Sequence, residues 1–319
     1  MKVLLVTPSD RRHGFEYMYS GRENLGVENL LAALRERGHE AVSRNENIPG
    51  FSIQPSGDPS EYDLIGFSLP FWEYRKQYVS IINDFATQTS AKLIAGGHAA
   101  TIGAKYFLSK CPALAGVVMG EGEETLVEIA DHIEHREDCS GILGFMTKAS
   151  YQPRQMLKSL DELHFPARDE LWLSLQTENA IKEALMETTR GCTYRCSFCS
   201  IPPYYKYAHG RRWRERSVES LCNELTALVS EFPDVNLISF TDDNFLGFNS
   251  RFHERATRIA KHLHTTKSGL GFEITCRVDA VVEEPFAELA ALGLVGVYLG
   301  IESGVQRILD AFPTASKVG

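Results

Sequence analysis

The chain has 319 residues, of which 43% are hydrophobic and 24% are charged. This composition is ordinary for a soluble globular protein, and the length predicts two domains. The formal net charge of −9 argues against a general nucleic-acid-binding protein, because such proteins present positive charge to phosphate. Apolar stretches all fall short of the about 20 residues that a membrane-spanning helix needs.

The chain opens with a short apolar run, Met1 to Thr7, that soon meets Asp10, Arg11 and Arg12. This run is too short for the core of a signal peptide. We therefore interpret it as a buried first strand and expect a cytoplasmic protein whose thiols stay reduced.

The first 140 residues alternate strand-like and helix-like segments, which is typical of a parallel α/β sheet. Leucines recur on one side of the segment from Asn24 to Arg37, which predicts a helix that ends at Gly38. A second helix begins with acidic residues after Gly120 and runs to about His135. The predicted strands are Val3–Val6, Ala41–Val42, Tyr62–Leu69, Lys92–Ala95 and Gly116–Met119. We expect residues 1–140 to form a flavodoxin-like, doubly wound domain with its ligand at the carboxyl ends of the strands.

Residues 141–180 are expected to connect this domain to a second one, and Gly141–Lys148 is a candidate strand within them. Residues 181–319 repeat the β/α pattern. A helix is expected from Ser217, its cap, to about Ser230, and another spans Val305–Phe312. The predicted strands of this part are Ala184–Thr189, Leu237–Thr241, Gly271–Arg277 and Gly296–Ile301.

Three cysteines follow the first of these strands at spacings of four and three positions: Cys192, Cys196 and Cys199. Cysteine thiolates hold iron–sulfur clusters, usually in fours. A loop with three of them leaves one iron of a four-iron cluster open to another ligand, which favours catalysis. The alternatives are a structural zinc site, which needs a fourth ligand such as His209, and idle thiols. An odd cysteine count in a chain of this size argues against a disulfide framework. We interpret the other four, Cys111, Cys139, Cys222 and Cys276, as small buried apolar residues.

This loop resembles the motif of the radical S-adenosylmethionine (SAM) superfamily, including an aromatic residue, Phe198, before the last cysteine. The resemblance implies a four-iron, four-sulfur (4Fe-4S) cluster held by Cys192, Cys196 and Cys199. It also implies that SAM chelates the open iron and is cleaved reductively to a 5′-deoxyadenosyl radical. The second domain would then be a partial (β/α) barrel.

Functional groups in α/β barrels gather at the carboxyl ends of strands. SAM offers an ammonium, a carboxylate and ribose hydroxyls, which suit carboxylates and a guanidinium. The residues that we expect in the SAM pocket are Asp242, Arg277, Glu302 and Ser303. The competing interpretation is that Asp242, Asp243 and Asn244 cap the helix that follows.

Three segments upstream resemble, in order and spacing, the cobalamin-binding domain of one large radical SAM subfamily: residues 62–68, 96–101 and 120–123. The resemblance implies cobalamin contacts at Gly96, Gly97, Gly120 and Gly122. The histidine that ligates cobalt in many cobalamin domains has no counterpart, because Asp10 to Gly14 has the wrong spacing, so we expect His13 to be a loop residue. His98 either lines the corrin pocket or caps a turn.

The resemblance implies a radical SAM enzyme, most simply a cobalamin-dependent methyltransferase acting on a small molecule. The alternatives are a cyclase or oxidoreductase of the same subfamily, and an inactive cobalamin- or metal-binding fragment. A one-electron reductant such as a flavodoxin or ferredoxin is the expected partner. The aromatic and basic segment Tyr204–Arg216 is expected to cover the cluster rather than to bind nucleic acid. The barrel of the superfamily has six β/α units and only four strands are counted here, so we expect a C-terminally truncated chain.

Overall fold

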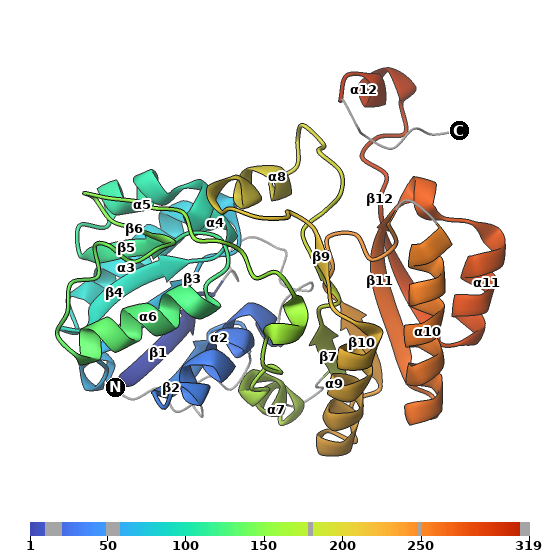
Figure 1. Cartoon of the computed structure of the whole chain (residues 1–319), viewed down its shortest axis with the longest axis horizontal. Helices are drawn as coiled ribbons and strands as arrows, with labels where there is room; N and C mark the ends of the chain where they lie inside the picture. Colours follow the sequence, from blue (N-terminus) through green and yellow to red (C-terminus); the bar gives the residue numbers. More distant parts are fainter. Residues whose placement is uncertain (10–20, 49–57, 178–180, 248–249, 313–319) are drawn as a thin grey trace. The chain divides into compact units, whose positions relative to one another are not determined.

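The computed structural model describes residues 1–9, 21–48, 58–177, 181–247 and 250–312. The chain divides into two compact units (Figure 1). Unit 1 comprises Met1–Met156, Leu163–Ile181 and Lys206–Gly210, and unit 2 comprises Leu157–Glu162, Lys182–Tyr205 and Arg211–Gly319. Each unit has its own sheet, and we describe them in turn.

Unit 1 is built on a six-stranded sheet in the order β2-β1-β3-β4-β5-β6. All neighbours are parallel except β6, which pairs antiparallel with β5. The strands are β1 (Lys2–Thr7), β2 (Glu40–Asn45), β3 (Leu64–Ser68), β4 (Lys92–Gly96), β5 (Leu114–Val118) and β6 (Phe145–Met146). The order of the first five is that of a flavodoxin-like fold, which confirms the predicted fold class.

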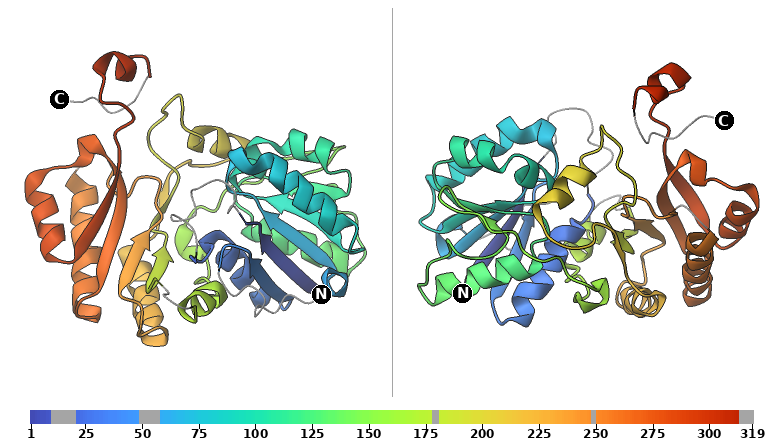
Figure 2. Two further views of the ribbon diagram at one scale, coloured as in Figure 1. Left: turned by 180° about the vertical axis from the view of Figure 1, so that it is seen from behind. Right: turned by 45° about the horizontal axis from the view of Figure 1, so that its top comes forward.

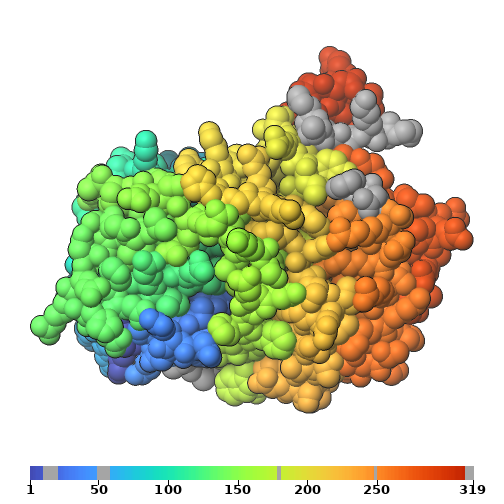
Figure 3. All heavy atoms as spheres, in the orientation of Figure 1, coloured from blue at the N-terminus to red at the C-terminus, as the bar shows by residue number. Residues whose placement is uncertain are grey.

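Helices cover both faces of this sheet (Figures 1 and 2). Tyr78 and Phe107 pack in the core on one face, and Leu31 and Ile129 pack in the core on the other. Because both faces are buried, β1 and β3 are almost continuously apolar rather than alternating. The helices are α2 (Leu25–Glu36), α3 (Arg75–Ala86), α4 (His98–Ile102), α5 (Ala104–Lys110), α6 (Glu123–Glu134) and α7 (Asp169–Leu175). Figure 3 shows the face of unit 1 on which α6 and the chain after it lie.

Buried carboxylates dock α7 onto unit 1. The carboxylate of Glu28 accepts hydrogen bonds from the backbone N–H groups of Asp169 (3.1 Å) and Glu170 (2.5 Å), which open the helix. Glu170 in turn accepts from the Asn24 backbone at 2.6 Å and from the Asn45 amide at 2.8 Å. These bonds satisfy N–H groups that the first turn of a helix leaves free.

An ion pair next to α7 is also buried. Arg168 donates to Glu23 at 2.7 Å, and both side chains are almost fully inaccessible to solvent. Arg168 adopts a left-handed backbone conformation, with φ of +66°, which is uncommon for a residue other than glycine. The stretch expected to be a connecting region is therefore anchored in its second half by polar contacts within unit 1.

Unit 2 contains a parallel sheet in the order β12-β11-β10-β7 and a small antiparallel ribbon of β8 and β9. Its strands are β7 (Glu183–Met186), β8 (Thr189–Arg190), β9 (Arg214–Glu215), β10 (Leu237–Phe240), β11 (Gly271–Arg277) and β12 (Leu294–Gly300). Its helices are α8 (Ile201–Tyr204), α9 (Val218–Glu231), α10 (Ser250–Thr266), α11 (Glu283–Ala291) and α12 (Gln306–Asp310). Four parallel β/α units confirm the expected partial barrel.

The strand β12 lies at the edge of the unit 2 sheet and exposes apolar side chains, with Val295 68% and Tyr298 44% accessible. Exposed apolar edges of this kind are sites where another chain or segment can pair. Among the described helices, none is both long and apolar enough to cross a bilayer.

The buried carboxyl of Glu170 makes the stability of unit 1 depend on pH. Burial raises the pKa of Glu170 from the ordinary 4.5 to about 7, so the folded chain holds this proton more tightly than the unfolded chain. The resulting stabilisation is complete below pH 4.5 and is lost as pH rises to about 7. We expect Glu170→Gln to remove that loss, so the variant gains stability relative to the natural chain between pH 5 and pH 8.

The free energy of unfolding in urea measures this effect, followed through Trp72 in a background that carries W172F and W213F. Glu36→Gln is the matched control, because Glu36 ends α2 with an exposed side chain. A difference between E170Q and its parent that stays constant from pH 5 to pH 8 would contradict the assignment.

Candidate functional site

The cysteine loop begins with a turn that only glycine tolerates. Gly191 follows β8 with φ of +82°, and a Cβ atom there would lie 1.8 Å from the carbonyl oxygen of Arg212. A left-handed backbone beside another backbone segment excludes every side chain. The left-handed turn at Gly191 therefore sets the direction in which the chain enters the loop at Cys192.

Each of the three thiols receives an N–H group. The backbone of Tyr194 donates to Cys192 at 3.5 Å, and the backbone of Ile201 donates to Cys199 at 3.5 Å. The guanidinium of Arg277 reaches the sulfur of Cys196 at 3.8 Å. Donors of this kind stabilise sulfur that carries negative charge, as the ligands of an iron–sulfur cluster do.

The three thiols can be compared with the site that a single zinc ion requires. Tetrahedral zinc with Zn–S bonds of about 2.3 Å places sulfurs about 3.8 Å apart. Among the described residues, ligand atoms that all lie within 4.8 Å of one another occur at His39, Asp131 and Glu134, and the three cysteines form no such group. They are nevertheless close enough for each charge to affect the others: burial raises the pKa of Cys192, and negative charge at Asp243, Cys199 and Cys196 raises it further. The assignment of Cys192, Cys196 and Cys199 as cluster ligands stays a prediction at this point.

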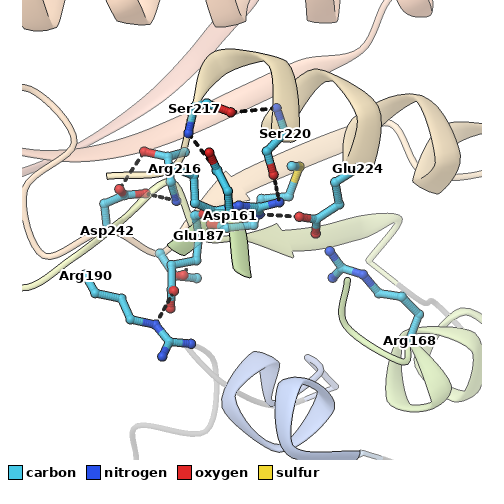
Figure 4. A network of polar contacts seen from close by, with 12 residues as sticks. Asp161, Arg168, Glu187, Arg190, Arg216, Ser217, Ser220, Glu224 and Asp242 are labelled. Carbon is cyan, nitrogen blue, oxygen red and sulfur yellow. Dashed lines mark hydrogen bonds and ion pairs between the residues drawn. The ribbon is translucent and has the colours of Figure 1, made fainter. Parts of the chain in front are cut away.

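A buried polar network fixes the chain just before the loop (Figure 4). Asp242, two residues after the end of β10, is 2% exposed. Its carboxylate accepts from the Thr188 N–H at 3.2 Å and from the hydroxyls of Thr188 (2.7 Å) and Thr189 (2.5 Å). Arg255 of α10 donates to the Thr188 hydroxyl at 3.0 Å and to the Thr188 carbonyl at 3.1 Å. Burial raises the pKa of Asp242, and these hydrogen bonds oppose the shift. Both carboxylate oxygens of Asp242 already accept hydrogen bonds within the protein. Its role as a SAM ligand therefore stays a prediction.

Asp243 is the carboxylate nearer to the cysteine loop, because it accepts a hydrogen bond from the backbone of Gly191. Desolvation by the surrounding protein raises its pKa, and repulsion by Asp242 and Glu187 acts in the same direction. Its side chain is open to solvent, which screens part of this shift. The competing interpretation from the sequence was that Asp243 caps the helix that follows. Its hydrogen bond to the Gly191 backbone joins it instead to the start of the cysteine loop.

Arg277, at the carboxyl end of β11, lies over the loop. Its guanidinium carbon is 3.9 Å from the centre of the Tyr194 ring, and Asp279 accepts two of its hydrogen bonds at 2.9 and 2.7 Å. Burial alone would lower the pKa of Arg277, but Asp279 reverses this, so the guanidinium keeps its charge. The sequence analysis did not identify Tyr194 as a site residue. Its position between Cys192 and Cys196 could have indicated that it lies at the site.

Glu302 and Ser303 follow β12. Glu302 has φ of +61°, and its charge raises the pKa of Cys199 after larger contributions from burial, Asp243 and Cys196. The hydroxyl of Ser303 accepts from the backbone of Val305 at 3.1 Å. Glu302 is thus within electrostatic range of Cys199, and the roles of Glu302 and Ser303 in the SAM pocket stay a prediction.

The glycines expected to contact cobalamin lie at the carboxyl ends of β4 and β5 in the unit 1 sheet: Gly96 is the last residue of β4, and the others follow β4 or β5. Gly97 has φ of +93°, and a Cβ there would come within 3.1 Å of the backbone of Leu69, so the loop after β4 packs closely on the loop after β3. At Gly120 a Cβ would meet nothing closer than Ala208, at 3.8 Å. Gly96 and Gly122 complete the set, with Gly122 capping α6. Glycine at the carboxyl ends of the strands lets a ligand approach the backbone, which is compatible with cobalamin, and the contacts of these four residues with it stay a prediction.

The aromatic and basic segment is divided between the units. Tyr207 and His209 contact unit 1: Tyr151 donates to the Tyr207 carbonyl, and the Met156 N–H donates to the His209 carbonyl at 2.7 Å. Arg216 is buried in unit 2 and pairs with Glu224. Much of the segment therefore serves packing, which is not evident from its composition. His13, expected to be a loop residue, lies outside the described residues.

Comparison with known proteins agrees with this geometry. Residues 186–317 match the family model of the radical SAM superfamily, and residues 21–130 match that of the B12 binding domain. An uncharacterised methyltransferase of Pyrococcus horikoshii is 30% identical over the whole chain, which spans 72% of that protein.

Two solved structures share the fold. The chain aligns over 99% of its length with OxsB, a cobalamin-dependent SAM radical enzyme solved with aqua-cobalamin and SAM, at a TM-score of 0.75 and 20% identity. It aligns over its whole length with TsrM of Kitasatospora setae, a radical SAM methyltransferase solved with cobalamin and a 4Fe-4S cluster, at a TM-score of 0.70 and 19% identity. The chain spans 46% of the first of these chains and 62% of the second.

The Thr188 hydroxyl is the centre of the Asp242 network, so its removal should destabilise unit 2. We expect Thr188→Val to lower the free energy of unfolding by about 1–3 kcal/mol, because the buried Arg255 guanidinium loses an acceptor and the Asp242 carboxylate loses one of its three donors. The measurement is urea unfolding followed through Trp213 in a background carrying W72F and W172F.

Thr265→Val is the matched control, because the exposed Thr265 hydroxyl donates only within its own helix α10. Its effect should stay within about 0.5 kcal/mol. Equal effects of the two substitutions would show that the network does not stabilise the strand end.

Proposed function

The chain belongs to the radical SAM superfamily, in the form that carries a B12 binding domain before the radical SAM core, and we propose that it is a cobalamin-dependent radical SAM methyltransferase. The observation that carries this proposal is the loop of three cysteines, each with its own N–H donor, following the first strand of a parallel β/α sheet. The similarity to a methyltransferase over the whole chain supports methyl transfer as the reaction.

In this proposal Cys192, Cys196 and Cys199 would hold a 4Fe-4S cluster, which would leave one iron without a protein ligand and available to SAM. When bound, the cluster supplies the electron that cleaves SAM to methionine and a 5′-deoxyadenosyl radical, and cobalamin carries the methyl group. The protein positions these groups, keeps out water and directs the radical to the substrate.

The chain contributes SAM-binding groups at the ends of its strands. We assign Glu302 to the ammonium of SAM, because its carboxylate already lies near Cys199, and Ser303 to a neighbouring polar group. Arg277 is placed to neutralise the SAM carboxylate, since it lies over the cysteine loop with its charge intact. Asp242 acts at one remove, by fixing the strand ends from which the loop starts.

At the carboxyl edge of unit 1, Gly96, Gly97, Gly120 and Gly122 bind cobalamin through the backbone rather than through side chains. Gly120 is the position that we assign to the closest approach of the corrin ring, because a Cβ atom there would meet nothing nearer than Ala208, at 3.8 Å. The substrate is a small molecule, and a flavodoxin or ferredoxin supplies electrons one at a time.

Anaerobic reconstitution tests this function. The chain is incubated with iron, sulfide and cobalamin, and then with SAM and a one-electron reductant. We expect absorption typical of a 4Fe-4S cluster and release of 5′-deoxyadenosine, both abolished in the variant with Cys192, Cys196 and Cys199 changed to alanine. Candidate substrates added to the same mixture should gain a methyl group.

Cys222→Ala is the matched control, because Cys222 is a half-buried thiol on α9 that belongs to no such loop. It should leave cluster formation and SAM cleavage unchanged. Absence of the cluster from the natural chain would reject the radical SAM function. A cyclised or oxidised product in place of a methylated one would reject methyl transfer alone.

A further inference from the structure

The guanidinium of Arg277 occupies a position relative to the cysteine loop that SAM binding alone does not require. It contacts the sulfur of Cys196 at 3.8 Å and stacks on the ring of Tyr194, two residues earlier in the same loop, at 3.9 Å. Both contacts are made by the protein itself. Arg277 is therefore bound to the loop before any ligand arrives.

Asp279 fixes the other side of the guanidinium. It accepts from the Nε atom at 2.9 Å and from an Nη atom at 2.7 Å, which is the two-point pairing that orients a planar guanidinium. This leaves the remaining Nη group directed at Cys196. Three contacts from three directions give the charge one position, which a flexible surface arginine does not have.

From this geometry we propose that Arg277 sets the reduction potential of the cluster through its charge and its hydrogen bond to the Cys196 sulfur. The inference rests on the proposed function, because it requires the cluster to be bound. Reduction adds one electron to the cluster, and the added negative charge is stabilised by a fixed cation and by N–H···S hydrogen bonds. Arginine suits this role since its guanidinium stays charged at every relevant pH.

Removing the charge should make the cluster harder to reduce. We expect Arg277→Gln to lower the equilibrium constant for one-electron reduction about tenfold, which is a fall of about 59 mV in potential. Arg277→Lys keeps the positive charge but loses the two-point pairing with Asp279 and the stacking on Tyr194. The reduction potential of this variant should lie between that of the natural chain and that of R277Q. Tyr194→Leu removes the stacking surface and should shift the potential in the same direction as R277Q.

The experiment is a redox titration of the reconstituted chain, monitored by electron paramagnetic resonance with low-potential dyes and no SAM present. Omitting SAM separates this role from any contact between Arg277 and the SAM carboxylate. Arg258→Gln is the matched control, because Arg258 is exposed on α10 and its loss changes the net charge equally. It should leave the potential unchanged.

The outcomes separate the inference from the proposed function. A natural chain that forms no 4Fe-4S cluster rejects the function. If the cluster forms and R277Q matches the natural potential, or shifts no further than R258Q, only the inference is overturned. If neither R277Q nor R277K retains the cluster iron of the natural chain, Arg277 is a structural residue of the loop, and that result also overturns the inference.

Discussion

Two threonine hydroxyls and a backbone N–H converge on the buried carboxylate of Asp242, and this contact joins the end of β7 to the end of β10. The arrangement matters because the cysteine loop departs a few residues later. A three-cysteine site has no fourth protein ligand to correct its geometry, so the positions of its thiols depend on where the chain enters the loop. Asp242 fixes that point, and Gly191 then sets the direction, because no side chain can occupy its position.

From this start, the remaining contacts of the loop come from strand ends that the same sheet holds in register. β11 pairs with β10 and β12 pairs with β11, so Arg277 reaches the loop from the end of β11, and Glu302 follows the neighbouring strand β12. Backbone N–H groups and one guanidinium then supply a donor for each sulfur. The protein thus places donors and fixed charge around the thiols, which are the means by which proteins tune a cluster whose chemistry is its own.

Most of the regular elements could be predicted from the sequence, because their signals are local. β3 and β4 are mostly apolar, Asn24 caps α2 and Gly38 follows its end, and the predicted bounds of β11 are those observed. The polar interior could not be predicted. Glu28 and Glu170 look like surface residues in the sequence, yet they are buried together although 142 positions separate them. Arg216 also looks like a surface residue and is buried with Glu224. Tyr194 could not be predicted as a site residue for the same reason, since its ring contacts Arg277, which lies 83 positions later in the chain.

The central claim is that the three cysteines hold a four-iron cluster with one iron free to bind SAM. Mössbauer spectroscopy of the chain, reconstituted anaerobically with iron enriched in the Mössbauer-active isotope, tests it most directly. The account predicts the spectrum of an oxidised 4Fe-4S cluster in which the signal of one iron of the four changes when SAM is added. A spectrum that SAM leaves unchanged, or iron bound as single ions, would contradict it.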